Sequence, residues 1–449
     1  MSSNGVLILS HCGFSFAEDL IAAIRARGLQ PFVLSSQPLQ EHGEKRLQAL
    51  RNIAAVVLSS DSHVLEITDV EDAIASLEAA GHTVRACISV WEGYRALMAK
   101  ANSLLGVRDL PAQRVDFLRN KLAVRNELHR EGLSRVSACL VTPDVLNALK
   151  RDPAPWFIKP ARGIASYGAF RLRSDTTWAT LEAIAASARE DTVYASALGK
   201  RVEFIAEGYL AGTEFSFEVL MSQGHPFVMA VHEKCELTEA NGTVLEDACT
   251  SPPASLSGGD LAAGLDWLRA VCFQLRLDWG CFHIETRFDG ARWDLIEVNP
   301  RVGGSFISHS VKALNGEASM LELWLDTLLE QPGGGEYRAL MSRLQRLSYA
   351  FDGTPPTALA TFFRVYFAEA GRVEHIELRQ GGRRPLIEQI LLKPGDVVPD
   401  TPRETFLGQL LWSMTQEERD VVLASLLEES ATAIDVRYQN LSLALETRS

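Results

Sequence analysis

The sequence has few cysteines, and no two of them have the spacing of a metal-ligand or redox motif. Seven cysteines are scattered over 449 residues, and none forms a Cys-x-x-Cys pair. An odd, scattered set argues against a disulfide framework and is typical of reduced thiols in a cytosol. We therefore expect a cytoplasmic protein.

Long hydrophobic runs and basic clusters are also missing. No stretch approaches the ~18 consecutive apolar residues of a membrane span, and the start, MSSNGVLILSHCG, has no basic region before its short apolar run. That start predicts a buried strand and not a signal peptide. The net charge is −13, without a long Lys/Arg cluster, which argues against a nucleic-acid surface. We expect neither a membrane nor a nucleic acid as a partner.

The composition is that of a globular chain, with 47% apolar and 22% charged residues. In the first part of the chain, apolar runs such as Val6–Ser10 alternate with an amphipathic stretch, which predicts a small parallel sheet. His11 ends the first run, where open α/β sheets tend to hold ligands. Leu110-Pro111 and the Pro/Gly stretch at 331–338 suggest boundaries, which gives predicted domains at 1–112, 113–330 and 331–449.

Two acidic residues lie close together in IETRFDGARWDLIEVNPRVGG, residues 284–304. Glu285 and Glu297 belong to two alternating segments that an Asp-Gly turn joins. A three-residue connection with Gly290 as a bulge puts both acids on one face. Glu285 would then oppose Leu295, Glu297 would oppose His283, and the acids would be diagonal neighbours about 5–8 Å apart at Cβ.

Apolar residues surround this pair, which indicates a buried hairpin instead of an exposed, charged one. Buried acids need partners, and Mg²⁺ prefers a few hard oxygen ligands, with phosphates or water completing its shell. Asn299 can add a neutral oxygen, and Arg301 can bind a phosphate or carboxylate bidentately. Gly303 and Gly304 would let backbone amides approach an anion.

A small-residue loop in FIKPARGIASYGAFRL, residues 157–172, is the candidate phosphate site. It is not a Walker A motif, because Ala and Phe follow Gly168 where Lys-Ser/Thr should stand. A loop from Gly163 to Gly168 that carries Ser166 could fold over a triphosphate, although a plain hairpin explains it equally well. Lys159 precedes the loop, and Lys121 lies in the middle of a helix that the spacing predicts over 115–133.

Taken in order, these motifs resemble the ATP-grasp superfamily over roughly residues 113–310, with IEVNPRVGG as the most specific piece. The chain looks like the carboxylate–amine ligase branch that makes dipeptides, the L-amino-acid ligases and dapdiamide synthases. The resemblance implies an ATP-grasp fold of mixed α/β and α+β class. Its parts would be an N-terminal parallel α/β domain, a small mobile lid subdomain at about 138–206 and a central antiparallel sheet.

The resemblance also assigns roles to residues of this chain. It implies ATP and Mg²⁺ as cofactors, with Mn²⁺ able to replace Mg²⁺. Arg301 would stabilise an acyl-phosphate and its tetrahedral successor. The other implied contacts are phosphates at Lys121, Lys159, Gly163, Ser166 and Gly168, the nucleoside at Glu207, Tyr209, Leu210 and Glu214, and metal at Glu285, Glu297 and Asn299.

The stretch VLEDACTSPP, residues 244–253, departs from the pattern of that branch. Related ligases often have Glu and His shortly before a proline; Glu246 matches, but Cys249 stands where His is expected. We read Cys249 as a small buried residue and Glu246 as the candidate that helps the amine lose a proton. His232, together with Arg301, Gly303 and Gly304, is the candidate for substrate binding.

The expected function is an ATP-dependent ligase that joins an amino acid, or a related acid, to an amino-acid amine through an acyl-phosphate. A purine-pathway or biotin-carboxylase-like ligase that activates a small acid is one alternative. A non-catalytic ATP-binding regulator is another, although neither acid nor Arg301 is lost. The expected partners are therefore small carboxylates and amines, and the flanking segments could build a homodimer.

Overall fold

The computed structural model describes residues 3–11, 16–37, 42–164, 166–190, 195–198, 201–240, 243–379, 382–399 and 405–439. Cys12, Gly13 and Phe14, which follow His11 in the sequence, lie outside these residues. Within them, no helix is both long enough and apolar enough to cross a membrane.

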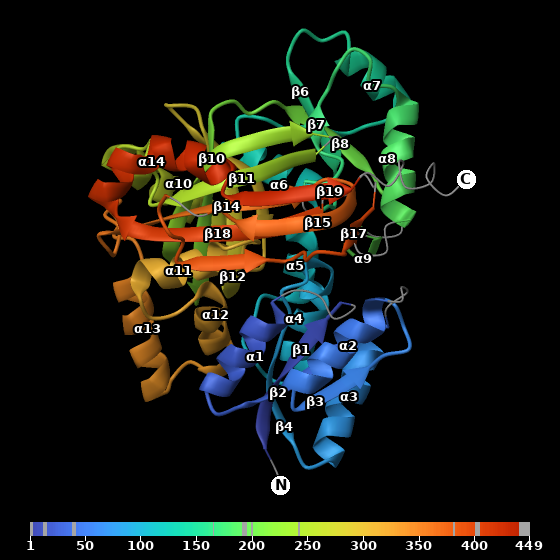
Figure 1. Cartoon of the computed structure of the whole chain (residues 1–449), viewed down its shortest axis with the longest axis vertical. Helices are drawn as coiled ribbons and strands as arrows, with labels where there is room; N and C mark the ends of the chain where they lie inside the picture. The colour runs from blue at the N-terminus through green and yellow to red at the C-terminus, as the bar shows by residue number, and fades with distance from the viewer. Residues whose placement is uncertain are drawn as a thin grey trace.

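A parallel four-stranded sheet of order β3-β2-β1-β4 forms the N-terminal part, at the bottom of Figure 1. Its strands are β1 (Asn4–Ser10), β2 (Gln30–Ser35), β3 (Val56–Ser59) and β4 (Thr83–Ile88), and its helices are α1 (Ala17–Ala26), α2 (His42–Ile53), α3 (Ile67–Ala79) and α4 (Arg95–Leu104). The central strand β1 is buried from Gly5 to Ser10, as a strand covered on both faces requires. The predicted parallel sheet is confirmed.

A second sheet of four strands, β5-β8-β6-β7, projects from the molecule at the top right of Figure 1. Its elements are β5 (Ala138–Leu140), α7 (Pro143–Leu149), β6 (Trp156–Pro160), β7 (Phe170–Arg171), α8 (Trp178–Glu190), α9 (Ala195–Leu198) and β8 (Phe204–Gly208). This sheet is stabilised by a small hydrophobic core of its own, in which Ile158, Leu181 and Phe204 are nearly inaccessible to solvent. This sheet lies within the segment where a lid subdomain was predicted.

The helix predicted over 115–133 is two helices, α5 (Ala112–Leu118) and α6 (Lys121–Arg130). The break comes at Asn120, whose side chain accepts a hydrogen bond from the backbone N–H of Ala123 and so caps α6. Asparagine is among the preferred residues for that position. Lys121 is therefore the first residue of α6 and not the middle of one long helix.

A largely antiparallel sheet of eight strands, β13-β12-β9-β10-β11-β14-β18-β16, runs across the centre of Figure 1. Its elements are β9 (Thr213–Ser222), β10 (His225–Ala240), β11 (Thr243–Ser251), β12 (Gly280–Phe288), β13 (Trp293–Asn299), β14 (Leu359–Ala368), β16 (Ile387–Ile390) and β18 (Thr405–Thr415). Helix α10 (Gly258–Gln274) packs on it through Gly264, where an added Cβ would lie 2.6 Å from the Trp293 ring.

The β12–β13 hairpin puts both acids on one face, but by another route than the expected one. Phe288 pairs with Trp293, so four residues form the turn, and Ile296 is an extra residue on β13. This bulge, and not one at Gly290, shifts the register. Glu285 therefore lies directly opposite Glu297, and the predicted pairs with Leu295 and His283 are wrong.

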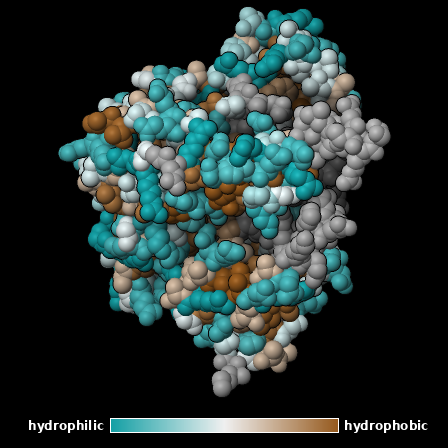
Figure 2. Space-filling view, in the orientation of Figure 1, coloured by the Kyte–Doolittle hydropathy of each residue, from teal (hydrophilic) through white to brown (hydrophobic). Residues whose placement is uncertain are grey.

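The remaining helices cover the sheet and the N-terminal domain, and a small sheet of three strands follows. These elements are α11 (Ile307–Asn315), α12 (Met320–Leu329), α13 (Gly335–Leu347), β15 (Gly371–Leu378), β17 (Val397–Val398), α14 (Gln416–Ala431) and β19 (Ile434–Gln439). The Pro/Gly stretch at 331–338, predicted to be a linker, turns into α13 at Gly335. The face in Figure 2 is largely hydrophilic, with separate hydrophobic patches.

Candidate functional site

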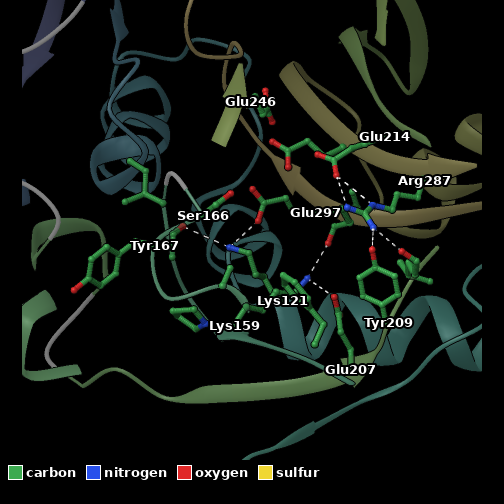
Figure 3. Close-up of a pocket in the computed structure, with 18 residues that line it drawn as sticks. Lys121, Lys159, Ser166, Tyr167, Glu207, Tyr209, Glu214, Glu246, Arg287 and Glu297 are labelled. Carbon is green, nitrogen blue, oxygen red and sulfur yellow. Dashed lines mark hydrogen bonds and ion pairs between the residues drawn. The ribbon is translucent and has the colours of Figure 1, made fainter. Parts of the chain in front are cut away.

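A cavity lies between the sheet β5-β8-β6-β7, called the lid sheet below, and the central sheet (Figure 3). Most of the predicted site residues line it: Lys121, Lys159, Gly163, Ser166, Glu207, Tyr209, Leu210, Glu214, Glu246, Glu285 and Glu297. Six others do not: Gly168, His232, Asn299, Arg301, Gly303 and Gly304. Segments more than a hundred residues apart in the chain thus meet at one hollow.

The two opposed acids form one wall of the cavity. Lys121 Nζ lies 2.8 Å from Glu297 Oε2. Burial raises the pKa of Glu297, but Lys121 outweighs it and brings the pKa down to about 2. For Glu285, burial and the facing Glu297 both raise the pKa. Asn299 Nδ2 lies 3.0 Å from Glu297 and 3.4 Å from Glu285, so the amide nitrogen, and not the predicted oxygen ligand, faces the acids.

Lys159 and Glu207 form a buried ion pair, with 2.6 Å between Nζ and Oε1. Arg125, which the sequence did not point to, holds the other oxygen of Glu207 at 2.9 Å and also contacts Asp294 at 3.0 Å. Lys159 Nζ further donates to the carbonyl of the bulge residue Ile296 at 3.2 Å. Burial, with Arg125 adding to it, lowers the pKa of Lys159. The bulge that aligns the acids therefore also anchors a lysine of the lid strand.

Tyr209, at the predicted adenine hinge, lies between two guanidinium groups. Arg171 lies over its ring at 3.7 Å, and Arg287 donates to its hydroxyl at 3.0 Å. Arg287 also binds Glu214 at 3.1 Å and the Leu210 carbonyl at 2.7 Å. Burial and then neighbouring carboxylates raise the pKa of Glu214 to about 7. Arg287 thus organises the predicted nucleoside residues, although no motif marked it.

The loop after β6 closes the opposite side of the cavity. The Gly163 carbonyl lies 3.5 Å from Lys121 Nζ, and Lys121 N–H donates to the Ala161 carbonyl at 2.9 Å. Gly168 adopts φ +70°, and a Cβ there would lie 2.9 Å from Ile184, so this glycine shapes the loop without lining the cavity. Of the predicted loop 163–168, residue 165 lies outside the described part of the chain.

Glu246 reaches the cavity from β11 and forms an ion pair with Lys234, whose side chain is fully buried. One carboxylate oxygen each of Glu214, Glu246 and Glu285 lie within 4.8 Å of one another. Cys249 is completely buried, and burial raises the pKa of its thiol, in agreement with the reading as a small core residue. A nucleophilic thiolate is therefore not available at this position.

Arg301 lies beside the acids and binds a residue of the N-terminal domain. Its Nη2 is 2.9 Å from Glu92 Oε2, and Glu92 is 4% exposed. Burial lowers the pKa of Arg301, but Glu92 and then Glu297 and Glu285 outweigh it and raise the pKa. The N-terminal domain thus supplies a carboxylate to the site, which no local pattern around Glu92 indicated.

Behind the acids, a chain of buried polar groups continues into the core. His283 Nε2 lies 3.0 Å from Glu285 Oε1, and His283 Nδ1 lies 2.8 Å from Glu218 Oε1. Burial disfavours the charged ring, but Glu218 and then Glu285 raise the pKa of His283 to about 10. The alternation of residues in the sequence already put His283 on the same face as Glu285. That pattern could have predicted the contact between them.

His232 belongs to the same chain of polar groups and not to the cavity wall. Its ring is fully buried, 3.5 Å from Glu218 and 2.9 Å from Ser310 Oγ. The predicted contact with substrate is therefore wrong for His232. An added Cβ on Gly303 would lie 2.8 Å from His283 Nδ1, so Gly303 makes room for that ring; around Gly304 the space is open.

Comparison with known proteins is consistent with this geometry. Residues 152–309 match the family model of the ATP-grasp domain. The whole chain superposes on an L-amino acid ligase from Bacillus licheniformis with a TM-score of 0.72, covering 98% of this chain and 99% of that one at 19% identity. The fold is the ATP-grasp fold.

Two other solved structures also superpose over nearly the whole chain. A phosphoribosylglycinamide synthetase from Anaerococcus prevotii gives a TM-score of 0.61 at 14% identity and covers 97% of this chain and 100% of that one. A biotin carboxylase from Campylobacter jejuni, in a complex with an ATP compound, gives 0.65 at 12% and covers 96% and 92%. A search of curated proteins by sequence gives no match.

An ATP-grasp domain implies ATP binding, usually with Mg²⁺, and the donor set here fits that cation. Glu285 and Glu297 are hard oxygen donors that face each other across β12 and β13. With their charges directly opposed, the pair is stabilised by any cation between them. Lys121 already contacts one of the two acids, and Lys159 lines the same cavity.

Proposed function

We propose that this protein is an ATP-dependent carboxylate–amine ligase that joins an amino acid, or a related carboxylic acid, to the amine of an amino acid. The products would be an amide, ADP and phosphate. The observation that carries the proposal is that Lys121 of α6 and Lys159 of the lid sheet line the same cavity as the opposed glutamates of β12 and β13. The similarity in fold to an L-amino acid ligase over nearly the whole length supports the choice of reaction.

Nucleotide binding uses residues from both sheets. Lys121 and Lys159 hold phosphate oxygens, and the loop that carries Ser166 covers them. Tyr209, Leu210 and Glu214 line the end of the cavity where the nucleoside would bind. Because Arg287 contacts all three, it has to exchange at least one of those hydrogen bonds when a nucleotide enters.

In the first step, a substrate carboxylate oxygen attacks the γ-phosphorus, and the bond from that phosphorus to the β,γ-bridging oxygen breaks. Bound Mg²⁺ supplies positive charge to the phosphate oxygens. Glu285 and Glu297 would hold this ion, and the two lysines would offset the remaining charge. Arg301 lies on the side of the N-terminal domain, where Glu92 keeps its guanidinium oriented.

In the second step, the amine nitrogen attacks the acyl carbon, the bond to the phosphate oxygen breaks, and a proton leaves the nitrogen. Glu246 is the residue we assign to that proton, because its carboxylate lines the cavity with one oxygen within 4.8 Å of an oxygen of Glu285. Its ion pair with Lys234 fixes the direction in which the carboxylate points. Closure of the loop after β6 would keep water from the acyl-phosphate.

The test is mass spectrometry of the products after incubation with ATP, Mg²⁺ and a mixed pool of amino acids. A dipeptide mass together with stoichiometric ADP supports the proposal. Phosphate release with bicarbonate or formate, and none with amino acids, would favour a carboxylase-like or purine-pathway ligase. The fold similarity to a biotin carboxylase and a phosphoribosylglycinamide synthetase is the reason to include those acids. ATP binding without turnover on any acid would indicate a regulator.

A further inference from the structure

Glu285 is held from behind by a residue that has no part in the proposed steps. The described hydrogen bonds of its side chain all use Oε1, which accepts from His283 Nε2 at 3.0 Å and from Asn299 Nδ2 at 3.4 Å. The acid lines the cavity and is 14% exposed, whereas the ring of His283 is 5% exposed. One carboxylate oxygen of Glu285, Oε1, is therefore already engaged in hydrogen bonds within the protein.

His283 itself has little freedom to turn. Its other nitrogen contacts Glu218, its direct partner on β9, at 2.8 Å. Gly303 packs so closely that a Cβ there would reach within 2.8 Å of Nδ1. Each ring nitrogen lies within hydrogen-bond distance of a carboxylate oxygen, so a rotated ring would lose both contacts.

Glu218 is held in turn by the core. Ser216 Oγ donates to the same oxygen, Oε1, at 3.0 Å, and the side chain of Glu218 is completely buried. From there the chain of contacts reaches His232 and then Ser310, whose hydroxyl lies 2.6 Å from Thr361 Oγ1 on β14. The orientation of Glu285 thus depends on strands β9 and β12 and not on a loop.

We propose that His283 is a positioning residue for the metal site, which fixes Glu285 so that Oε1 is engaged and Oε2 alone is left for the cation. The inference rests on the metal-binding part of the proposed function and not on the identity of the substrates. Partners that hold a metal ligand from behind typically contribute about 10- to 100-fold in metal affinity.

The test is the dissociation constant of Mn²⁺, measured by electron paramagnetic resonance with a non-hydrolysable ATP analogue bound. In His283→Gln the single amide nitrogen can take the place of only one of the two ring nitrogens, so we expect a constant about 10- to 100-fold higher. Ser310→Ala is the matched control: it belongs to the same buried chain but is four contacts away from Glu285, so we expect a change of no more than about twofold. Melting curves check that each variant is folded, and His283→Asn replaces a Gln variant that does not fold.

Two results would overturn the inference and leave the proposed function in place. One is a folded His283→Gln protein with the wild-type constant for Mn²⁺. The other is an equal loss in Ser310→Ala, which would mean that core packing, and not the contact to Glu285, sets the affinity. If the wild-type protein binds the ATP analogue but no Mn²⁺, the proposed metal site is wrong, and the role of His283 is wrong with it.

Discussion

Replacing Glu297 by Gln removes one negative charge from the acid pair with little change in shape. The side chain of Glu297 is 21% exposed, and Lys121, at 2.8 Å, outweighs the effect of its partial burial and lowers its pKa from 4.5 to about 2. A depressed pKa stabilises the folded state above the unfolded pKa, and this stabilisation is lost as the pH falls through the folded pKa. At pH 7 it is fully present and amounts to at most on the order of 3 kcal/mol, at 1.36 kcal/mol for each pKa unit.

Urea denaturation at pH 7 without ligand should therefore show a lower free energy of unfolding for Glu297→Gln by up to that amount. The same variant should lose ATP turnover and the thermal stabilisation by Mg²⁺ and ATP, since one of the two anionic metal ligands is gone. Glu388→Gln, an exposed glutamate on β16 of the same sheet, is the control and should change neither property. Full turnover in Glu297→Gln would refute the metal assignment.

Three further predictions concern other walls of the site. Lys159→Met should weaken binding of an ATP analogue by about 10- to 100-fold in calorimetry, whereas the exposed Lys100→Met should leave it unchanged; equal affinities would remove the phosphate role. Burial and neighbouring carboxylates raise the pKa of Glu214 to about 7, so its ionisation costs stability as the pH rises from 4.5 through 7. Without metal, Glu214→Gln should therefore melt higher relative to wild type at pH 8 than at pH 5; an equal difference at both would count against this. Gly303→Ala puts a methyl group 2.8 Å from the His283 ring and should lower the melting temperature; an unchanged one would contradict the packing.

The acid pair could be predicted from the sequence, but the β-bulge that aligns the two acids could not. Alternation placed Glu285 and Glu297 on faces whose relation depends on one inserted residue, and an Asp-Gly turn made Gly290 the natural candidate. The insertion is Ile296, between Leu295 and Glu297, and the alternation of Trp293, Leu295, Glu297 and Asn299 gives no sign of it. Hydrophobic pattern specifies which face is buried, but it does not specify where a strand carries an extra residue.

Residues that hold the predicted ones were missed for a different physical reason. Arg125 and Glu92 are single charges without a motif, and their partners Glu207 and Arg301 lie on elements remote in the sequence. An ion pair between residues far apart in the sequence leaves no local sequence pattern, because each residue on its own resembles a solvated surface charge. The break at Asn120 was readable from capping preference, yet the continuous amphipathic spacing masked it.

Because the β-bulge lies within β13, the alignment of the two acids does not depend on the turn that joins β12 and β13. Phe288 pairs with Trp293 before the bulge, and beyond it the acids are in register whatever connects the two strands. A Cβ added to Gly290, at the tip, would meet no other described part of the protein within 4 Å, but its φ of +90° favours glycine. A peptide inserted at that tip should therefore leave Gly290 in place, and the carboxylates a few residues away would then keep their register.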